Sequence, residues 1–286
     1  MIGSRAITTP FRRMFGRAMP SRGQGVLAFV STNDTITPAL TVSGGPTPKW
    51  VVVESTGKTF TYEAASFSHT KTAGTGNLTV RLVNTEAVKS YVTGINFYAD
   101  GIVSTVSSLQ LTKLNNLISL TLFDNTNMTG DLIRAYANID NCVYLVVPNT
   151  SMSGNFTGIN LSNVVSTINI RDNQYFSGQL NTTSISSSLV SFYAYNCYFD
   201  SGIRIPVAAS SLQNYQIQNN GLTQAAVDQI CLDAYNNRAN FTYATPTFNV
   251  GGTNAAPSGI YQDAIYKLVN DPDVEGFNKQ VWTYTA

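Results

Sequence analysis

The chain of 286 residues has 17 lysines and arginines against 16 aspartates and glutamates. Charged residues make up 12% of it, about half the share of an average soluble protein, and serine, threonine and asparagine take their place. This near-neutral balance excludes an electrostatic surface able to hold a long stretch of nucleic acid. An uncharged polar surface of this kind is more typical of an extracellular or virion protein than of a metabolic enzyme.

Histidine and cysteine are too scarce for the common kinds of catalytic and metal site. His69 is the only histidine, and its context, SFSHT, predicts a strand or turn in which it has a structural role. Cys142, Cys197 and Cys231 lack the paired spacing of a CxxC motif and are expected to be buried thiols. We therefore predict no enzyme activity, no metal and no cofactor. No run approaches the roughly 18 apolar residues of a membrane span, and no secretory signal is evident.

Residues 1–22 are basic, because they contain arginines and no acidic residue before Asp34. If FRRMFGRAM is helical, its phenylalanines share one face opposite the arginines. We expect this arm to dock in an acidic groove of a capsid or tail protein. An anionic membrane and a phosphate backbone are the alternative partners, and a disordered tail is the simplest alternative. The expected docking residues are Arg5, Phe11, Arg12, Arg13, Phe15 and Arg17.

Residues 23–75 are predicted to form a small β-rich cap. The runs VLAFV, ALTVSG, KWVVVES and KTFTYEA are short and β-prone, and glycine, proline, asparagine and serine separate them. An antiparallel cap of this kind would cover the first unit of the segment that follows, since a bare sheet edge invites aggregation.

Residues 76–286 repeat a pattern with a spacing of 24 residues. Four glycines keep that spacing: Gly130, Gly154, Gly178 and Gly202. Apolar alternations of the form L-x-x-L-x-L-x-x-N recur with them, and a period of about 20 to 29 residues with this motif is the leucine-rich-repeat pattern. The sequence therefore predicts an α/β solenoid of leucine-rich repeats with a parallel β-sheet, preceded by the β-rich cap and the basic arm.

A polar residue ends each motif and is expected in a buried ladder that bonds neighbouring backbones. The predicted ladder residues are Asp100, Asn125, Asn149, Asn173, Cys197 and Asn220. The unit CVYLVVPNT is ambiguous. We favour the glycine spacing, which places Tyr144 and Val146 inside, because a slip of one residue turns every side chain to the other face. The alternative, with Cys142, Leu145 and Val147 inside, fits the leucine motif better.

The last two repeats lengthen to 33 residues, and the added length is predicted to be helical. One apolar stripe follows Thr223 as its N-cap, and a second follows Ser258. The segments NNGLTQAAVDQICLDAY, FNVGGTNAAPSGIYQ and LVNDPDVEGFNKQVWTYT resemble the C-terminal end of leucine-rich-repeat proteins from Bacteroidetes-type bacteria and their phages. The resemblance spans residues 76–286 and implies the fold and a generic binding surface.

Strand residues that alternate with the inward ones are expected to line the concave face. Monomers seldom leave a large apolar and aromatic strip in water, so we predict a contact face for a protein, a glycan or another copy. The predicted binding residues are Tyr98, Phe123, Leu145, Val147, Arg171, Tyr193 and Tyr195. Asp124 and Asp172 are candidates for a glycosidase pair, but two strand spacings would hold them roughly 10 Å apart, which is wide even for an inverting enzyme.

Together these features favour a phage virion structural protein. Its arm would dock on capsid or tail, and its repeat surface would bind a protein or the host surface. The alternatives are a bacterial cell-surface adhesin and a glycan-degrading spike. Expected partners are other virion proteins through residues 1–22, a host-surface protein or glycan, and further copies in a homo-oligomer or multicopy assembly. The expected location is the virion, with the bacterial cell surface as the alternative.

Overall fold

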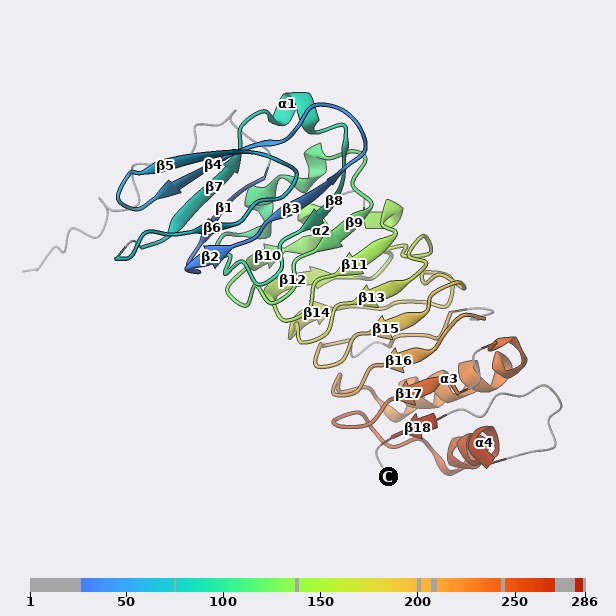
Figure 1. Cartoon of the computed structure of the whole chain (residues 1–286). Helices are drawn as coiled ribbons and strands as arrows, with labels where there is room; N and C mark the ends of the chain where they lie inside the picture. Colours follow the sequence, from blue (N-terminus) through green and yellow to red (C-terminus); the bar gives the residue numbers. More distant parts are fainter. Residues whose placement is uncertain are drawn as a thin grey trace, which may run out of the picture.

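The computed structural model describes residues 27–74, 76–136, 139–199, 202–206, 210–242, 245–270 and 281–284. The expected docking residues, Arg5, Phe11, Arg12, Arg13, Phe15 and Arg17, lie outside these ranges. Figure 1 shows an elongated arrangement in which the strands of one long sheet follow one another from a β-rich N-terminal end to a helical C-terminal end.

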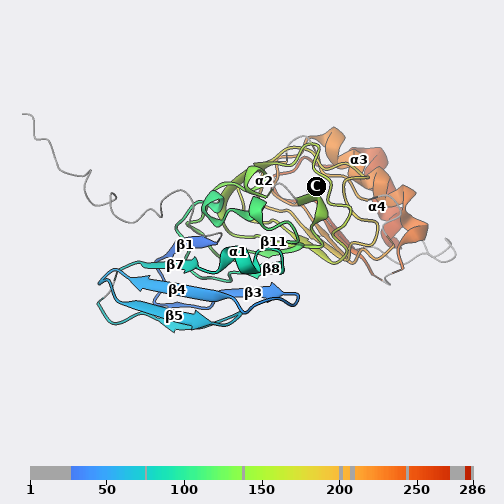
Figure 2. The same ribbon diagram turned by 90° about the horizontal axis from the view of Figure 1, so that it is seen from above.

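Antiparallel pairing joins four strands into an N-terminal sheet, in the order β1 (Ala28–Ser31), β7 (Leu78–Leu82), β4 (Lys49–Glu54) and β5 (Thr59–Glu63). Figure 2 shows these strands side by side at one end of the molecule. Burial alternates along β4, where Trp50 and Val52 are fully buried, because one face of the strand lies on a core. A separate pair consists of β2 (Thr35–Ile36) and β6 (His69–Thr70).

The long sheet has nine strands. They are, in order, β3 (Ala39–Val42), β8 (Val92–Asn96), β9 (Ser119–Thr121), β11 (Tyr144–Val146), β13 (Thr167–Asn169), β15 (Ser191–Tyr193), β16 (Asn214–Gln216), β17 (Thr247–Asn249) and β18 (Val281–Thr283). From β8 onward each strand is parallel to its neighbour, whereas β3 is antiparallel to β8. The central residue of successive strands points into the core: Ile95, Leu120, Leu145, Ile168, Phe192, Tyr215 and Phe248.

A second parallel sheet lies between the turns that return the chain to the long sheet. It contains β10 (Thr129–Asp131), β12 (Ser151–Asn155) and β14 (Tyr175–Ser177). The short helical segments are α1 (Thr85–Val88), α2 (Leu132–Ala135), η1 (Val106–Leu109), η2 (Leu111–Lys113), η3 (Ile139–Asn141) and η4 (Arg238–Asn240). Phe156 packs on Phe176 and Phe199 with ring centroids 5.3 and 5.7 Å apart, so aromatic rings fill this part of the core.

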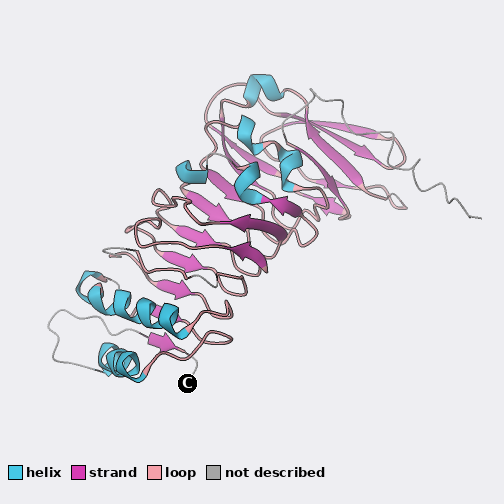
Figure 3. Cartoon of the chain, turned by 180° about the vertical axis from the view of Figure 1, so that it is seen from behind, coloured by secondary structure: helices cyan, strands magenta, loops and turns pink. Residues whose placement is uncertain are grey.

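The two long helices lie at the C-terminal end, as the sequence predicted. They are α3 (Gln224–Asn236) and α4 (Gly259–Asn270), seen in front of the last strands in Figure 3. Thr223 is the N-cap of α3, since its side chain accepts a hydrogen bond from the Ala226 backbone. Trp282 pairs with Phe248, so the last spacing is 34 residues and not 33. No helix in the described ranges is long and apolar enough to cross a membrane.

The predicted fold class, an α/β solenoid of leucine-rich repeats with a parallel sheet, is wrong. Sheets dominate the described residues, and the long sheet is mixed because β3 enters it antiparallel. From β9 to β16 the returning chain forms a second sheet and short helical turns, so long helices occur only in the last two units. The fold is therefore β-rich. In addition, β7, which follows the expected domain boundary at residue 75, lies in the N-terminal sheet.

Buried asparagines bond one unit of the long sheet to the next. Asn173 donates from Nδ2 to the carbonyl oxygens of Val147, Ile170 and Arg171, at 2.8 to 2.9 Å, and accepts the Thr150 N–H at 3.1 Å. Equivalent bonds are made by Asn125 and Asn220. Asp100 and Cys197 are buried at the corresponding positions. Each side chain satisfies backbone groups that no water reaches.

The register expected for the 142–150 unit is wrong. Leu145 and Val147 are fully buried instead of exposed. Asn149 is exposed, with a φ of 53°, and Thr150 occupies the buried position expected for it. The leucine motif, which placed Cys142 inside, therefore predicts this strand better than the glycine spacing.

Two local changes of length explain the error. The spacing from Asn125 to Thr150 is 25 positions, and the spacing from Thr150 to Asn173 is 23, so an inserted residue is cancelled one unit later. The glycines hide this shift. Gly130 lies opposite Met152, not opposite Gly154, in the second sheet.

Candidate functional site

The candidate site is the outer face of the long sheet, which we divide into three rows. The Arg171 row consists of Tyr98, Phe123, Pro148, Arg171, Tyr195 and Gln218. The Asn169 row consists of Asn96, Thr121, Val146, Asn169, Tyr193 and Gln216. The left-handed row consists of Ala99, Asp124, Asn149, Asp172, Asn196 and Asn219, all with positive φ. Backbone hydrogen bonds between successive strands hold the members of each row side by side.

Arg171 lies at the centre of the first row. Its guanidinium carbon is 5.6 Å from the Phe123 ring centroid and 5.7 Å from that of Tyr195. Buried Pro148 lies between Phe123 and Arg171 in the row, and its compact ring leaves room for the arginine to cross it. Cation–π attraction on both sides holds the guanidinium flat against the face. Its Nε is 3.3 Å from Asp172, while its terminal nitrogens have no hydrogen-bond partner among the described residues.

Aromatic rings extend the row on both sides of the arginine. Tyr98 and Phe123 are stacked, with centroids 4.9 Å apart and planes at 15°, and Tyr98 remains 54% exposed. Partial burial raises the pKa of the Tyr195 hydroxyl, so it stays protonated at neutral pH and can donate a hydrogen bond. The row thus presents flat apolar surfaces beside free polar groups.

The second row contains a buried amide without a partner. Asn169 is only 7% exposed, between Val146 and Tyr193, and its Oδ1 accepts no hydrogen bond in the described structure. In the first row, the Oε1 of Gln218 is likewise buried and unpartnered. A buried acceptor without a donor costs about 1 to 3 kcal/mol, which marks both atoms as candidate ligand contacts.

The left-handed row is an exposed chain of amides and carboxylates. Asn149 donates to Asp124 at 2.7 Å, and Asn196 donates to Asp172 at 2.6 Å. Asn219 donates to Asn196 at 2.8 Å. Since Asn149 lies between the two aspartates, they are two strand spacings apart, roughly 10 Å, and each is bonded to an amide. They do not form the paired carboxylates of a glycosidase.

The structure brings five of the seven predicted binding residues onto one face. Tyr98, Phe123, Arg171, Tyr193 and Tyr195 lie there, whereas Leu145 and Val147 lie in the core. Sequence reasoning missed Pro148, Asn149 and Asn169 because the slipped register hid the first two and because asparagine is too common in this chain to stand out. The leucine motif was the available signal for the first two.

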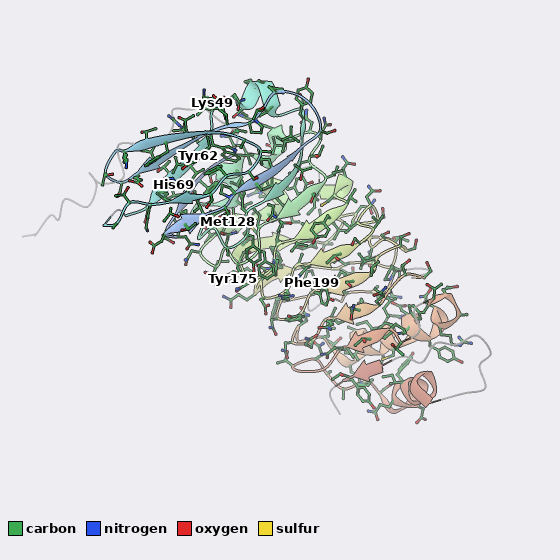
Figure 4. All side chains as sticks on the ribbon, in the orientation of Figure 1. Lys49, Tyr62, His69, Met128, Tyr175 and Phe199 are labelled. Carbon is green, nitrogen blue, oxygen red and sulfur yellow. The ribbon has the colours of Figure 1, made fainter. Side chains whose placement is uncertain are left out.

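His69 lies in a buried cluster in the N-terminal sheets, beside Tyr62 in Figure 4. The Tyr62 hydroxyl is 2.7 Å from Nδ1, and Nε2 is 3.5 Å from Glu54 Oε1. The Thr72 backbone donates to Glu54 at 2.8 Å and holds the pKa of that carboxyl below its usual value. His69 and Glu54 are each 2% exposed, so a substrate has no access to them.

The cysteines are buried free thiols, as predicted. Burial raises the pKa of Cys142 to about 11 and that of Cys197 to about 12, so neither is a thiolate at neutral pH. In the described ranges no three histidine, cysteine or acidic side chains could hold a metal ion. Comparisons with protein-family models, curated proteins and solved structures found no match.

Proposed function

We propose that this protein is a non-enzymatic structural protein of a phage virion, and that the outer face of the long sheet is its binding surface for a host protein or glycan. The observation that supports binding is the Arg171 row. A guanidinium lies between two aromatic rings with unused donors, and an unpartnered amide oxygen is buried in the next row. Arginine and tyrosine are the residue types most enriched at binding hot spots.

A catalytic role has little support among the described residues. The single histidine is buried, and the two aspartates of the outer face are separated and bonded to amides. Acid–base catalysis needs groups that reach a substrate in a common site. Binding without chemistry is the function that these side chains fit best.

The virion location is supported by composition and by the N-terminal sequence. The uncharged polar composition suits a particle protein, and the arginines of residues 1–22 suit docking onto an acidic groove of a capsid or tail protein. Other virion proteins and further copies of the chain remain its proposed partners.

Deleting residues 1–22 tests the docking role. We expect the shortened chain to be lost from purified particles while its melting temperature stays that of the full chain, because the deleted residues lie outside the described β-rich body. Quantitative mass spectrometry of particles measures incorporation, and differential scanning calorimetry measures melting. Normal incorporation of the shortened chain would remove the docking role.

A bacterial surface adhesin is the second candidate, because the same outer face would serve it. The two candidates differ in where the native protein is found. Antibody labelling of purified particles and of uninfected cells separates them, since a virion protein labels particles alone. Label on uninfected cells would replace the virion assignment and leave the binding face in place.

The binding surface has its own test. Replacing Tyr193 and Tyr195 with serine should weaken attachment to host cells by about tenfold, because two hot-spot rings are lost. Melting should change little, since both side chains lie on the outer face. Tyr175→Ser is the matched control, because Tyr175 is 55% exposed and lies in β14, outside the three rows. Equal attachment by all variants would exclude this face.

A further inference from the structure

The outer face is unusually poor in both charge and aliphatic surface. Across the three rows the charged side chains are Arg171, Asp124 and Asp172, and the only branched aliphatic one is Val146, which is 6% exposed. The centre of a protein–protein interface is normally its most apolar part. With Leu145 and Val147 turned into the core, this face lacks the aliphatic centre that a protein partner would cover.

The polar groups of the face match a ligand rich in hydroxyls. Asn169 Oδ1 and Gln218 Oε1 are buried acceptors without donors, and the terminal nitrogens of Arg171 are donors without acceptors in the described structure. A hydroxyl donates one hydrogen bond and accepts two, so it can serve both kinds of group. Asn149 and Asn196 extend this pattern along the exposed edge of the face.

The aromatic groups add the apolar half of the match. A sugar ring has a flat face of C–H groups with hydroxyls around its rim. The stacked pair of Tyr98 and Phe123 and the ring of Tyr195 offer flat apolar surfaces to such C–H faces. Because the rows advance by about 5 Å per strand, these surfaces form a line that suits several linked sugars better than one small molecule.

We infer that the outer face binds an oligosaccharide. The chain lies along the Arg171 row, its sugar faces rest on Tyr98, Phe123 and Tyr195, and its hydroxyls bond Arg171, Asn169 and Gln218. This inference rests on the proposed function, which left protein and glycan ligands open, and it selects the glycan.

The probe is an array of immobilised oligosaccharides that carry hexose, N-acetylhexosamine and uronic acid units, with the full chain as analyte. We expect retention on one class of glycan. Asn169→Ala and Arg171→Ala should each weaken that retention about tenfold or more, because each removes a hydrogen-bonding group aimed at the ligand. Tyr175→Ser and Tyr198→Ser should bind as the native chain does, since these tyrosines are 55% and 59% exposed outside the rows.

The other outcomes separate the inference from the proposed function. If the native chain binds no glycan on the array, or if the Asn169 and Arg171 variants bind as tightly as it does, the oligosaccharide inference is overturned. If in that case these variants still lose attachment to host cells, the face binds a protein and the proposed function stands. If they keep attachment as well, both fail. Melting temperatures equal to that of the native chain show that the variants are folded.

Discussion

Asp100 shows how one atom decides the behaviour of a buried ladder residue. Asparagines at this position use Nδ2 as a donor to backbone carbonyls, as Asn125 does. Asp100 accepts the Thr37 N–H at 2.6 Å, but its Oδ2 is buried without a partner. A carboxylate has no proton to donate there. Burial therefore raises the pKa of Asp100 from 3.8 to about 6, despite the opposing bond from Thr37.

Asp100→Asn should stabilise the protein at neutral pH. Asp100 binds its proton more tightly in the folded chain, so its contribution is largest below pH 4 and is lost as the pH rises to about 6. The loss is at most about 3 kcal/mol. Asparagine keeps the acceptor for Thr37 and regains a donor. Urea unfolding should show the variant more stable at pH 7, with the advantage shrinking toward pH 4. A constant difference, or a less stable variant at pH 7, would contradict the assignment.

Among the elements, β11 is the one for which the sequence predicted the wrong face. Apolar alternation predicted a strand there in either register, and only the burial of Leu145 and the exposure of Tyr144 choose between them. The choice depends on an inserted residue that the next unit cancels, and no local propensity records such a compensation. The other outward residues of the rows were predictable because their units keep an unbroken alternation.

The β11 register makes a direct prediction about two asparagines. Asn173→Ala should destabilise the protein by about 3 kcal/mol, because it leaves buried backbone groups of the Val147 and Thr150 unit unpaired. Asn149→Ala should cost less than about 1 kcal/mol, since its amide is exposed. Chemical unfolding of both variants measures the difference. Similar losses for the two would restore the register that the glycine spacing favoured.

A second pair tests the same strand through its apolar residues. Leu145→Ala should cost about 2 to 5 kcal/mol, because it opens a cavity beneath the long sheet. Tyr144→Ala, at a side chain 38% exposed, should cost less than about 1 kcal/mol. The reverse order of stability in thermal unfolding would mean that β11 shows its other face to the core.

At the scale of the whole molecule, the sequence predicted individual strands and the C-terminal helices better than it predicted the class of fold. The repeated motif fixes which residues point inward, but it does not fix what fills the return path between strands. There the chain uses β10, β12 and β14, which the regular spacing did not reveal. Nor could it show that β3, far earlier in the chain, adds to the long sheet as an antiparallel edge, because that pairing is non-local.

The arrangement places the proposed binding face on a rigid support. Each residue of the rows is held by backbone bonds to both neighbouring strands, and the buried asparagines fix the turn behind them. Sites built on such strands lose little conformational entropy when a ligand binds. We therefore expect affinity to depend on the side chains of the rows and not on loop rearrangement.

The most direct test is hydroxyl-radical footprinting of the full chain, free and bound to bacterial envelopes that retain it. Modification of Tyr98, Tyr193 and Tyr195 should fall on binding, because the ligand covers the outer face. Modification of Tyr175 and Tyr198, exposed outside the rows, should stay unchanged. Protection of Tyr175 and Tyr198 with Tyr98, Tyr193 and Tyr195 still open would contradict the assignment of the binding face.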